Sequence, residues 1–424
     1  MSTLKERDRE VIWHPYTPMK IRPESIGIVS GDGVYLQDED GKRYIDAIAS
    51  WWVNLHGHAH PHIAQRVSTQ LQTLEHCIFA GFSHEPAVQL AERLLPILPG
   101  PMAKIFYSDN GSTAVEVAIK MALQYWGNKG LKKKKVVAIE GAYHGDTFGA
   151  MSVSGRSIFT APFDEKLFDV TFIPFPEEGK EQESLNVLES LLQDNDVAAF
   201  IAEPLVQGTA GMRMYDPAIL EQYFGLCKKY DALVIADEVM TGFGRTGPLF
   251  ACDTIETGPD MVCLSKGLTG GTMAMGITAT TQQVYDAFYD DDMLKTLYHG
   301  HSYTANPVSC AAALASLDLT LDEACSANRE RIEAQHKIFA AGIKNNSKVR
   351  DTRIMGTILA LELDTGAPTS YTNAQRDLIY NFFIDRNILL RPLGNIIYLM
   401  PPYCITNDEL KYIYSSITDL INSL

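Results

Sequence analysis

The sequence is short of cysteine and has no long apolar run. Its seven cysteines among 424 residues are scattered, odd in number and never arranged as C-x-x-C. This usage argues against a disulfide framework and suits a reduced, cytoplasmic protein. No apolar run approaches the roughly 20 residues that a membrane-spanning helix needs. The polar start MSTLKERDRE predicts no signal peptide. We therefore expect a cytoplasmic location and no membrane partner.

Basic residues are also scarce. Lysine and arginine total 36 against 52 aspartate and glutamate residues, which gives a formal net charge of −16. Such a balance argues against nucleic acid and anionic membranes as partners, because like charges repel. The hydrophobic content of 46% is ordinary for a globular protein. The length allows two or three domains.

A carboxylate and a lysine follow two short apolar runs in the middle of the chain. Ala232–Ala236 is followed by Asp237, and Met261–Leu264 is followed by Ser265 and Lys266. Both runs are typical of buried strands. In an open α/β sheet, ligands bind at the carboxyl ends of the strands. A desolvated lysine there loses its proton more easily and can form a Schiff base with an aldehyde.

This pair of residue types is what pyridoxal 5′-phosphate requires of a protein. The lysine binds the aldehyde, and the carboxylate keeps the pyridine nitrogen protonated so that the ring can serve as an electron sink. Taken singly, Asp237 could cap a helix and Lys266 could be a solvated surface lysine. Their joint position at two strand ends favours the cofactor.

A dinucleotide site is the alternative for the same stretch. Gly242–Gly247 matches G-x-G-x-x-G, but it does not follow the strand directly and Pro248 comes next. The fingerprint of a dinucleotide site opens a helix straight after a strand. We therefore interpret the match as a glycine-rich loop.

A phosphate-binding turn is predicted farther towards the N-terminus. Ile105–Tyr107 is typical of a strand, and Gly111, Ser112 and Thr113 open a segment with apolar side chains at helical spacing. Backbone N–H groups and hydroxyls at a helix N-terminus form a ready phosphate site. An ordinary helix cap would explain this segment alone, but the cofactor needs a phosphate site. Tyr143, between glycines after another strand, can stack on a flat ring.

These segments together resemble the class III pyridoxal-phosphate aminotransferases, from about residue 10 to the C-terminus. The resemblance implies that Lys266 and Asp237 are the catalytic residues. Tyr143, in the motif Y-H-G, would cover the pyridine ring. The implied cofactor-binding residues are Gly111, Ser112, Tyr143, Glu203, Gln207, Asp237, Lys266, His301 and Ser302.

Two further motifs contain some of these cofactor-binding residues. Glu203 and Gln207 match E-P-x-x-Q-G, whose glutamine contacts the phenolic oxygen of the cofactor in the family. Gly300–Ser302 matches H-G-x-T/S, which reaches the cofactor phosphate of the neighbouring subunit. The resemblance therefore implies a homodimer with active sites at the interface. Serine stands where threonine is commoner, and the hydroxyl is kept.

The resemblance also implies an α/β fold of fold type I, with a large domain around a mostly parallel sheet and a smaller α+β domain. Alternating apolar runs and helical patterns up to about residue 310 favour a parallel sheet as well. We expect an N-terminal segment at 1–50 that packs with the small domain, a large domain at 51–309 and a small domain at 310–424. Val34–Leu36 and Tyr44–Ile45 flank a turn typical of a hairpin.

Alternating histidines at His56, His58, His60 and His62 suggest a metal site. Glycine and proline interrupt the run, and no cysteine or carboxylate lies close by in the sequence, so we expect no metal. The four lysines at 132–135 are expected to form a solvated sheet edge.

Several stretches resemble a narrower branch of the family, which acts in biotin biosynthesis. They are Trp13–Thr17, Ser50–Trp52, Tyr143–Met151, Gly211–Tyr215 and Arg391–Tyr403. That resemblance implies transfer of an amino group from S-adenosyl-L-methionine to 8-amino-7-oxononanoate. The implied substrate-binding residues are Tyr16, Trp51, Tyr143, Lys266, Gly300 and Arg391.

Alternatives remain open at this point. Another class III enzyme of the ornithine, acetylornithine or γ-aminobutyrate type, or an aminomutase, would share the cofactor motifs. Lysine is a second amino donor among enzymes of the narrower branch. A scaffold that binds the cofactor without turnover would not need Lys266 to move a proton.

Overall fold

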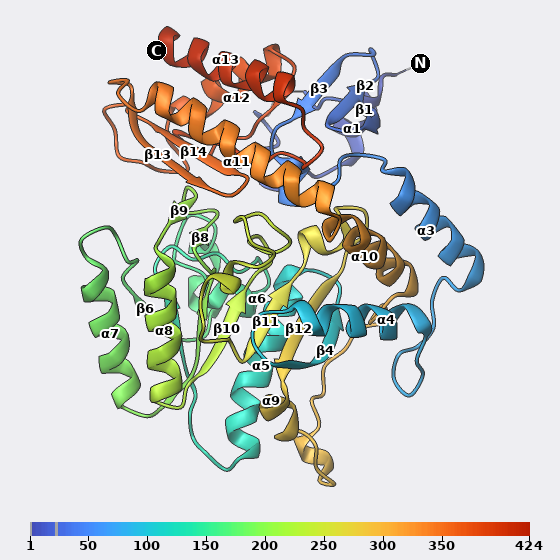
Figure 1. Cartoon of the computed structure of the whole chain (residues 1–424), viewed down its shortest axis with the longest axis vertical. Helices are drawn as coiled ribbons and strands as arrows, with labels where there is room; N and C mark the ends of the chain where they lie inside the picture. The colour runs from blue at the N-terminus through green and yellow to red at the C-terminus, as the bar shows by residue number, and fades with distance from the viewer. Residues whose placement is uncertain (1, 22–23) are drawn as a thin grey trace.

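The computed structural model describes residues 2–21 and 24–424. Figure 1 shows two layers along the long axis, with a large sheet and its helices below and a smaller group of strands and helices above. Both chain ends lie in the upper part. The predicted α/β fold, with a large mostly parallel sheet and a smaller α+β part, is confirmed.

Most neighbouring strands of the large sheet run parallel to each other. Within the described residues its order is β4 (Met102–Ser108), β12 (Gly276–Thr281), β11 (Met261–Leu264), β10 (Leu233–Asp237), β7 (Val197–Ala202), β5 (Lys135–Ile139) and β6 (Thr171–Ile173). β12 runs antiparallel to β4 and β11, whereas the remaining neighbours are parallel. The parallel strands therefore place several carboxyl ends along one edge.

Both faces of β10 are buried, which explains why its sequence is uniformly apolar. Leu233 and Ile235 pack into the cluster around α5 (Gly111–Asn128), and Val234 and Ala236 pack into the cluster on the opposite face. Alternate residues of a strand point to opposite faces, so a strand covered on both sides reads as a continuous apolar run.

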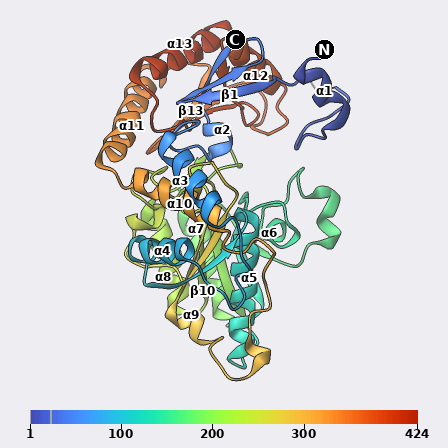
Figure 2. The same ribbon diagram turned by 90° about the vertical axis from the view of Figure 1, so that its right-hand side faces the viewer.

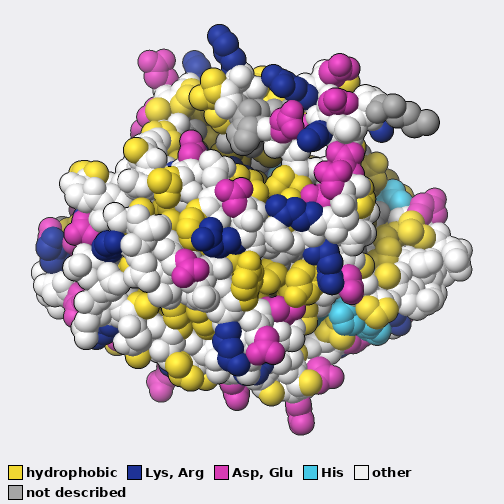
Figure 3. Space-filling model, turned by 90° about the horizontal axis from the view of Figure 1, so that it is seen from above, with side chains coloured by type: hydrophobic (Ala, Val, Ile, Leu, Met, Phe, Trp, Pro, Cys, Tyr) yellow, Lys and Arg dark blue, Asp and Glu magenta, His cyan; other side chains and the backbone are white. Residues whose placement is uncertain are grey.

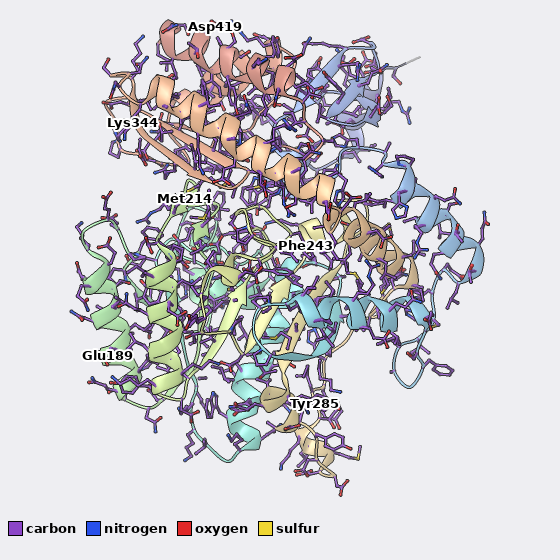
Figure 4. The ribbon with its side chains drawn as sticks, viewed as in Figure 1. Glu189, Met214, Phe243, Tyr285, Lys344 and Asp419 are labelled. Atoms are coloured by element: carbon purple, nitrogen blue, oxygen red, sulfur yellow. The ribbon has the colours of Figure 1, made fainter. Side chains whose placement is uncertain are left out.

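Helices cover the two faces of the sheet (Figures 1 and 2). Those of the lower part are α3 (Pro61–Thr73), α4 (Glu85–Leu94), α5, α6 (Phe148–Ser152), α7 (Glu181–Gln193), α8 (Pro217–Lys229), α9 (Gln282–Asp286) and α10 (Pro307–Thr320). A short ribbon, β8 (Val206–Gln207) with β9 (Arg213–Met214), lies at the top of this part. Figure 4 places Met214 and Phe243 at its upper edge, whereas Lys344 and Asp419 belong to the upper part.

The upper part combines the two ends of the chain. Its elements are α1 (Leu4–Val11), β1 (Ile28–Asp32), β2 (Tyr35–Asp38), β3 (Arg43–Asp46), α2 (Ala49–Trp52), α11 (Glu323–Ile343), β13 (Val349–Met355), β14 (Ile358–Leu363), α12 (Gln375–Asp385), β15 (Ile388–Leu389), β16 (Ile396–Leu399) and α13 (Asn407–Ser423). The predicted hairpin is β2–β3, and β3 pairs in parallel with β15. The domain limits at residues 50 and 309 stay predictions.

The surface of the upper part carries charges of both signs. Figure 3 shows acidic and basic side chains interspersed over the face seen from above. No helix among the described residues has the length and apolar character of a membrane span. In the lysine run at 132–135, Lys132 and Lys134 are exposed as predicted, whereas Lys133 is buried, with Nζ 4.4 Å from the Trp126 ring centre.

Candidate active site

A cavity of about 270 Å³ lies where β10 and β11 end, and it brings together six of the predicted cofactor residues. Its lining comprises Trp52, Asn110, Gly111, Ser112, Tyr143, His144, Gly145, Glu203, Asp237, Val239, Met240, Ser265 and Lys266. Parallel pairing sets Asp237 opposite Cys263, so the lysine begins the turn just beyond that register. The strand ends therefore assemble the site that the sequence spacing predicts.

Asp237 is held in one orientation by two donors. His144 Nδ1 donates to its Oδ2 at 2.7 Å, and the backbone N–H of Val239 donates to its Oδ1 at 3.1 Å. Both Asp237 and His144 are buried. A buried carboxylate fixed by a histidine and a backbone amide offers a stable negative charge to a cationic ring nitrogen.

Lys266 lies at the start of the turn after β11, with its amine against an aromatic ring. Nζ is 4.6 Å from the centre of the Trp52 ring. Desolvation lowers the pKa of Lys266 to about 8, against the opposing charges of Asp237 and Glu203. Near neutral pH a useful fraction of the amine is therefore unprotonated and able to attack an aldehyde. Its backbone φ of +44° is unusual for a residue with a side chain and marks local strain.

The N-terminus of α5 forms the phosphate end of the cavity. The helix begins at Gly111, capped by Asn110, whose side chain accepts from Thr113 N at 3.0 Å. A Cβ on Gly111 would lie 2.8 Å from Val239 Cγ1, so only glycine fits this approach. Ser112 Oγ accepts from the backbone N–H of Asp146 at 3.3 Å. Small residues thus leave room for an anion at a helix N-terminus.

Glu203 supports the loop that carries Tyr143. Its carboxylate accepts from the backbone N–H groups of Tyr143 at 2.9 Å and Gly208 at 3.1 Å. Burial, together with the charge of Asp237, raises the pKa of Glu203 to about 7, against the lowering effect of His144 and of the two backbone donors. Glu203 therefore fixes the position of the loop that carries Tyr143 and also contributes a carboxyl group to the pocket.

Pyridoxal 5′-phosphate fits this set of residues. Asp237 could face the pyridine nitrogen, Lys266 the aldehyde, Gly111 and Ser112 the phosphate, and Tyr143 the ring face. Two features of this chain favour the cofactor: the tight approach at Gly111 and the lowered pKa of the Lys266 amine.

The predicted substrate residues gather beside the cavity. Tyr16 Oη is 3.3 Å from Tyr143 Oη, and its ring centre is 5.5 Å from that of Trp51. Arg391 Cζ lies 4.9 Å from the Trp51 ring centre. Tyr16 also donates a short hydrogen bond to Asp146. The structure thus brings together side chains from both ends of the chain and from its middle.

The segment that presents Trp51 and Trp52 has a strained backbone. Ala49, Ser50 and Trp52 have φ values of 50°, 60° and 69°. Asp46 holds the segment, because its carboxylate accepts from Ser50 N at 2.6 Å. Such strain persists where surrounding contacts fix it, and it is common at functional sites.

Four further predicted residues lie neither in the cavity lining nor in the group of Tyr16, Trp51 and Arg391 beside it. Gln207 is buried, and its Nε2 donates to Glu140 O at 3.2 Å, whereas its Oε1 has no hydrogen-bond partner among the described residues. The loop before α10 contains Gly300, His301 and Ser302. It forms a local turn, since Thr304 Oγ1 accepts from His301 N at 3.2 Å. Their assigned contacts stay predictions.

Three of the four alternating histidines have separate hydrogen-bond partners. His58 Nε2 lies 2.9 Å from Asp46 Oδ2, His56 Nε2 lies 3.2 Å from Ser316 Oγ, and His62 Nε2 lies 2.9 Å from Asp318 Oδ2. Within residues 2–21 and 24–424, no group of three or more histidine, cysteine or acidic side chains is arranged to hold a metal ion.

Three residues of the site were not singled out from the sequence. Trp52 contacts the lysine, His144 holds Asp237, and Asp146 binds Tyr16. Each stands within a motif of the sequence, namely the paired tryptophans or the segment after Tyr143. The motifs were the available signal, but only the fold shows which member of each motif points inward.

Comparisons with known proteins agree with this geometry. Residues 17–421 match the family model described as aminotransferase class-III. An adenosylmethionine-8-amino-7-oxononanoate aminotransferase from Synechococcus elongatus is 49% identical over 423 residues, covering 97% of this chain and 99% of the relative. A crystal structure of the enzyme of that name from Methanocaldococcus jannaschii superposes with a TM-score of 0.94 at 36% identity, covering 99% of this chain and 98% of the other.

A second solved structure is more distant in sequence. The omega transaminase from Pseudomonas jessenii in complex with PMP superposes with a TM-score of 0.93 at 27% identity. The match covers 100% of this chain and 98% of the other.

Proposed function

The chain belongs to the class-III aminotransferases, and we propose that it transfers an amino group from S-adenosyl-L-methionine to 8-amino-7-oxononanoate, giving 7,8-diaminononanoate in biotin biosynthesis. The observation that carries the proposal is the cluster of Tyr16, Trp51 and Arg391 beside the pocket of Lys266 and Asp237. Relatives named for this reaction align over nearly the whole chain. We further propose a cytoplasmic location.

The cofactor is pyridoxal 5′-phosphate, which supplies an aldehyde and an electron sink. Asp237, fixed by His144, would keep the pyridine nitrogen protonated. Lys266 would hold the cofactor covalently and then, as a free amine, move a proton at the substrate carbon. The Trp52 ring packs against that amine, with its centre 4.6 Å from Nζ. Tyr143 would cover the ring.

The acceptor has a carboxylate far from its reacting ketone, joined by an aliphatic chain. A groove of about 650 Å³, lined in part by Tyr16, Tyr380, Arg391 and Pro392, adjoins the site. A guanidinium can bind a carboxylate through two parallel hydrogen bonds. Arg391 is therefore the proposed partner of the acceptor carboxylate, and it would also take the α-carboxylate of the donor in turn.

The proposed function is tested directly by single-turnover spectroscopy. Holoenzyme mixed with S-adenosyl-L-methionine should lose the absorbance of the aldehyde form of the cofactor, and later addition of 8-amino-7-oxononanoate should restore it. Mass spectrometry should detect 7,8-diaminononanoate. L-Lysine, ornithine and γ-aminobutyrate serve as competing donors. If the enzyme reacts faster with one of these compounds than with S-adenosyl-L-methionine, that compound is the amino donor and the proposed donor is wrong.

Replacing Arg391 by alanine should slow both half-reactions about tenfold or more, because each carboxylate would lose a charge-assisted hydrogen bond. Stopped-flow rates at several substrate concentrations measure the change. Arg386→Ala is the matched control, since Arg386 caps the C-terminus of α12 and its Cζ packs 3.6 Å from the Phe382 ring centre, outside the groove lining. Unchanged rates in Arg391→Ala would remove the shared carboxylate site.

The active form is proposed to be a homodimer with shared sites. Support comes from the exposed aromatic side chains Tyr298 and Tyr303, which flank the loop of Gly300, His301 and Ser302. By family resemblance, this loop would reach the cofactor phosphate in the neighbouring subunit. An interface between two copies would cover these aromatic rings.

Heterodimers test the shared site. A Lys266→Ala subunit and a Ser302→Asp subunit should each be inactive as homodimers, the second because a carboxylate would repel the phosphate. When the two are co-expressed with different tags, the purified heterodimer should regain about half of the wild-type activity, since one of its two sites is intact. An inactive heterodimer, or a fully active monomer in sedimentation, would contradict the shared site.

A further inference from the structure

A second cavity adjoins the cofactor pocket. Its volume is about 300 Å³, and it shares Tyr143 and Gly145 with the cofactor pocket. Asp146, Phe159 and Tyr371 also line it. A group extending from a substrate at Lys266 past Tyr143 would therefore enter this space.

Two aromatic rings from distant segments bound the cavity. The ring centres of Phe159 and Tyr371 are 4.9 Å apart, at an interplanar angle of 73°. Phe159 also contacts the Tyr16 ring, with the centres 5.7 Å apart. Arg376 Cζ packs 4.9 Å from the Tyr371 ring centre and helps to fix that ring. Such rings attract flat heteroaromatic groups and cations.

The charge on this cavity comes from a carboxylate. Asp146 is exposed and accepts from the Tyr16 hydroxyl, and within the described part of the chain no lysine, arginine or histidine forms an ion pair with it. Arg156 also lines the cavity, but its Nη1 donates to the carbonyls of Met151, Ser152 and Ser154. Its Nε lies 3.9 Å from Asp164. The carboxylate of Asp146 is therefore available to a cationic ligand.

We propose that this cavity binds the adenosyl and sulfonium part of the amino donor, and that Phe159 and Tyr371 are specificity-determining residues for that donor. The proposal rests on the proposed function. The adenine ring packs against the two aromatic rings, and the sulfonium lies near the carboxylate of Asp146. The acceptor chain uses the groove of Arg391, so that Tyr16 separates the two substrate subsites.

Two nucleoside probes without an amino-acid end test the subsite by binding alone. One is 5′-deoxy-5′-dimethylsulfonioadenosine, which carries the positive charge, and the other is the neutral 5′-deoxy-5′-methylthioadenosine. Calorimetry on the holoenzyme should show the cation binding about tenfold more tightly, as expected for a cation beside aromatic rings and a carboxylate. Equal affinities, or no binding of either probe, would overturn the proposal.

Single substitutions show which residues of the cavity bind the two probes. Phe159→Leu and Tyr371→Leu should weaken both probes several-fold, whereas Asp146→Asn should remove the preference for the cation. Phe163→Leu is the matched control, because Phe163 packs on Phe148 and does not line the cavity. Thermal melting checks that each variant is folded. Wild-type binding in both leucine variants would overturn the assignment.

Kinetics separate this inference from the function on which it rests. Phe159→Leu and Tyr371→Leu should raise the KM for S-adenosyl-L-methionine and leave the half-reaction with 7,8-diaminononanoate unchanged. Transfer from S-adenosyl-L-methionine by variants with an unchanged KM would reject the subsite alone. If wild-type enzyme binds the probes as expected but accepts no amino group from S-adenosyl-L-methionine, the proposed function fails and the subsite stands.

Discussion

Turnover is expected to fall by about 10²-fold to 10⁴-fold or more when Lys266 is replaced by alanine, because the proposed proton carrier is removed. The absorbance of covalently held cofactor should also disappear, although free cofactor can still occupy the pocket. Stopped-flow rates and an absorbance spectrum after gel filtration measure the two effects. Lys337→Ala, an exposed lysine on α11, is the control. Near-normal turnover in Lys266→Ala would contradict the assignment of the lysine.

The pH dependence of cofactor capture tests the protonation state of the Lys266 amine. Desolvation lowers the pKa of Lys266 to about 8, and only the unprotonated amine attacks an aldehyde. The rate at which cofactor-free enzyme captures the aldehyde should therefore rise with pH and level off above about 8. An inflection near 10.5, the ordinary value for lysine, would mean that the amine is not desolvated.

Strands of the large sheet could be predicted closely because local sequence determines them. The run Met261–Leu264 matches β11, and Ala232–Ala236 differs from β10 by one residue at each end. Both strands are buried on two faces, so an apolar run is their direct signature. The start of α5 differs from the prediction, since the sequence predicts a helix opened by Ser112 and Thr113, whereas Asn110 provides the cap and the helix begins at Gly111.

Long-range pairing could not be predicted in the same way. β3 pairs with β15, which brings Ile45 opposite Ile388 from the other end of the chain. Nothing in either short segment specifies that partner. Lys133 shows the same limit, because a lysine run normally lies in solvent, whereas this side chain packs over Trp126 and donates to backbone carbonyls of the turn after α8.

Site residues that belong to sequence motifs could be predicted. Those whose role depends on tertiary contacts could not. Asp237 and Lys266 stand at strand ends, so their meeting follows from the topology of a parallel sheet. The contact of His144 with Asp237 depends instead on two loops and their exact approach. Phe159 and Tyr371 come from segments without any motif, and only the folded chain brings their rings together.

Asp237→Asn should lower the rate of the chemical step about 100-fold or more, because it removes a preorganised negative charge from a buried site. Asparagine keeps nearly the same shape, and the affinity for substrates should change little. Single-turnover rates at saturating donor, compared with the donor concentration that gives half the maximal rate, separate the two quantities. An effect confined to the concentration dependence would contradict the proposed role.

Glu238→Gln provides the matched control for neutralising a buried carboxylate. Glu238 follows Asp237 in the sequence but accepts from the backbone N–H groups of Ala251 and Cys252, away from the cavity lining. Burial already raises the pKa of Glu238 to about 7, so part of the population is neutral at that pH. Glu238→Gln should therefore reduce thermal stability with little change in the single-turnover rate. The catalytic loss would then be specific to the carboxylate that His144 holds towards the pocket.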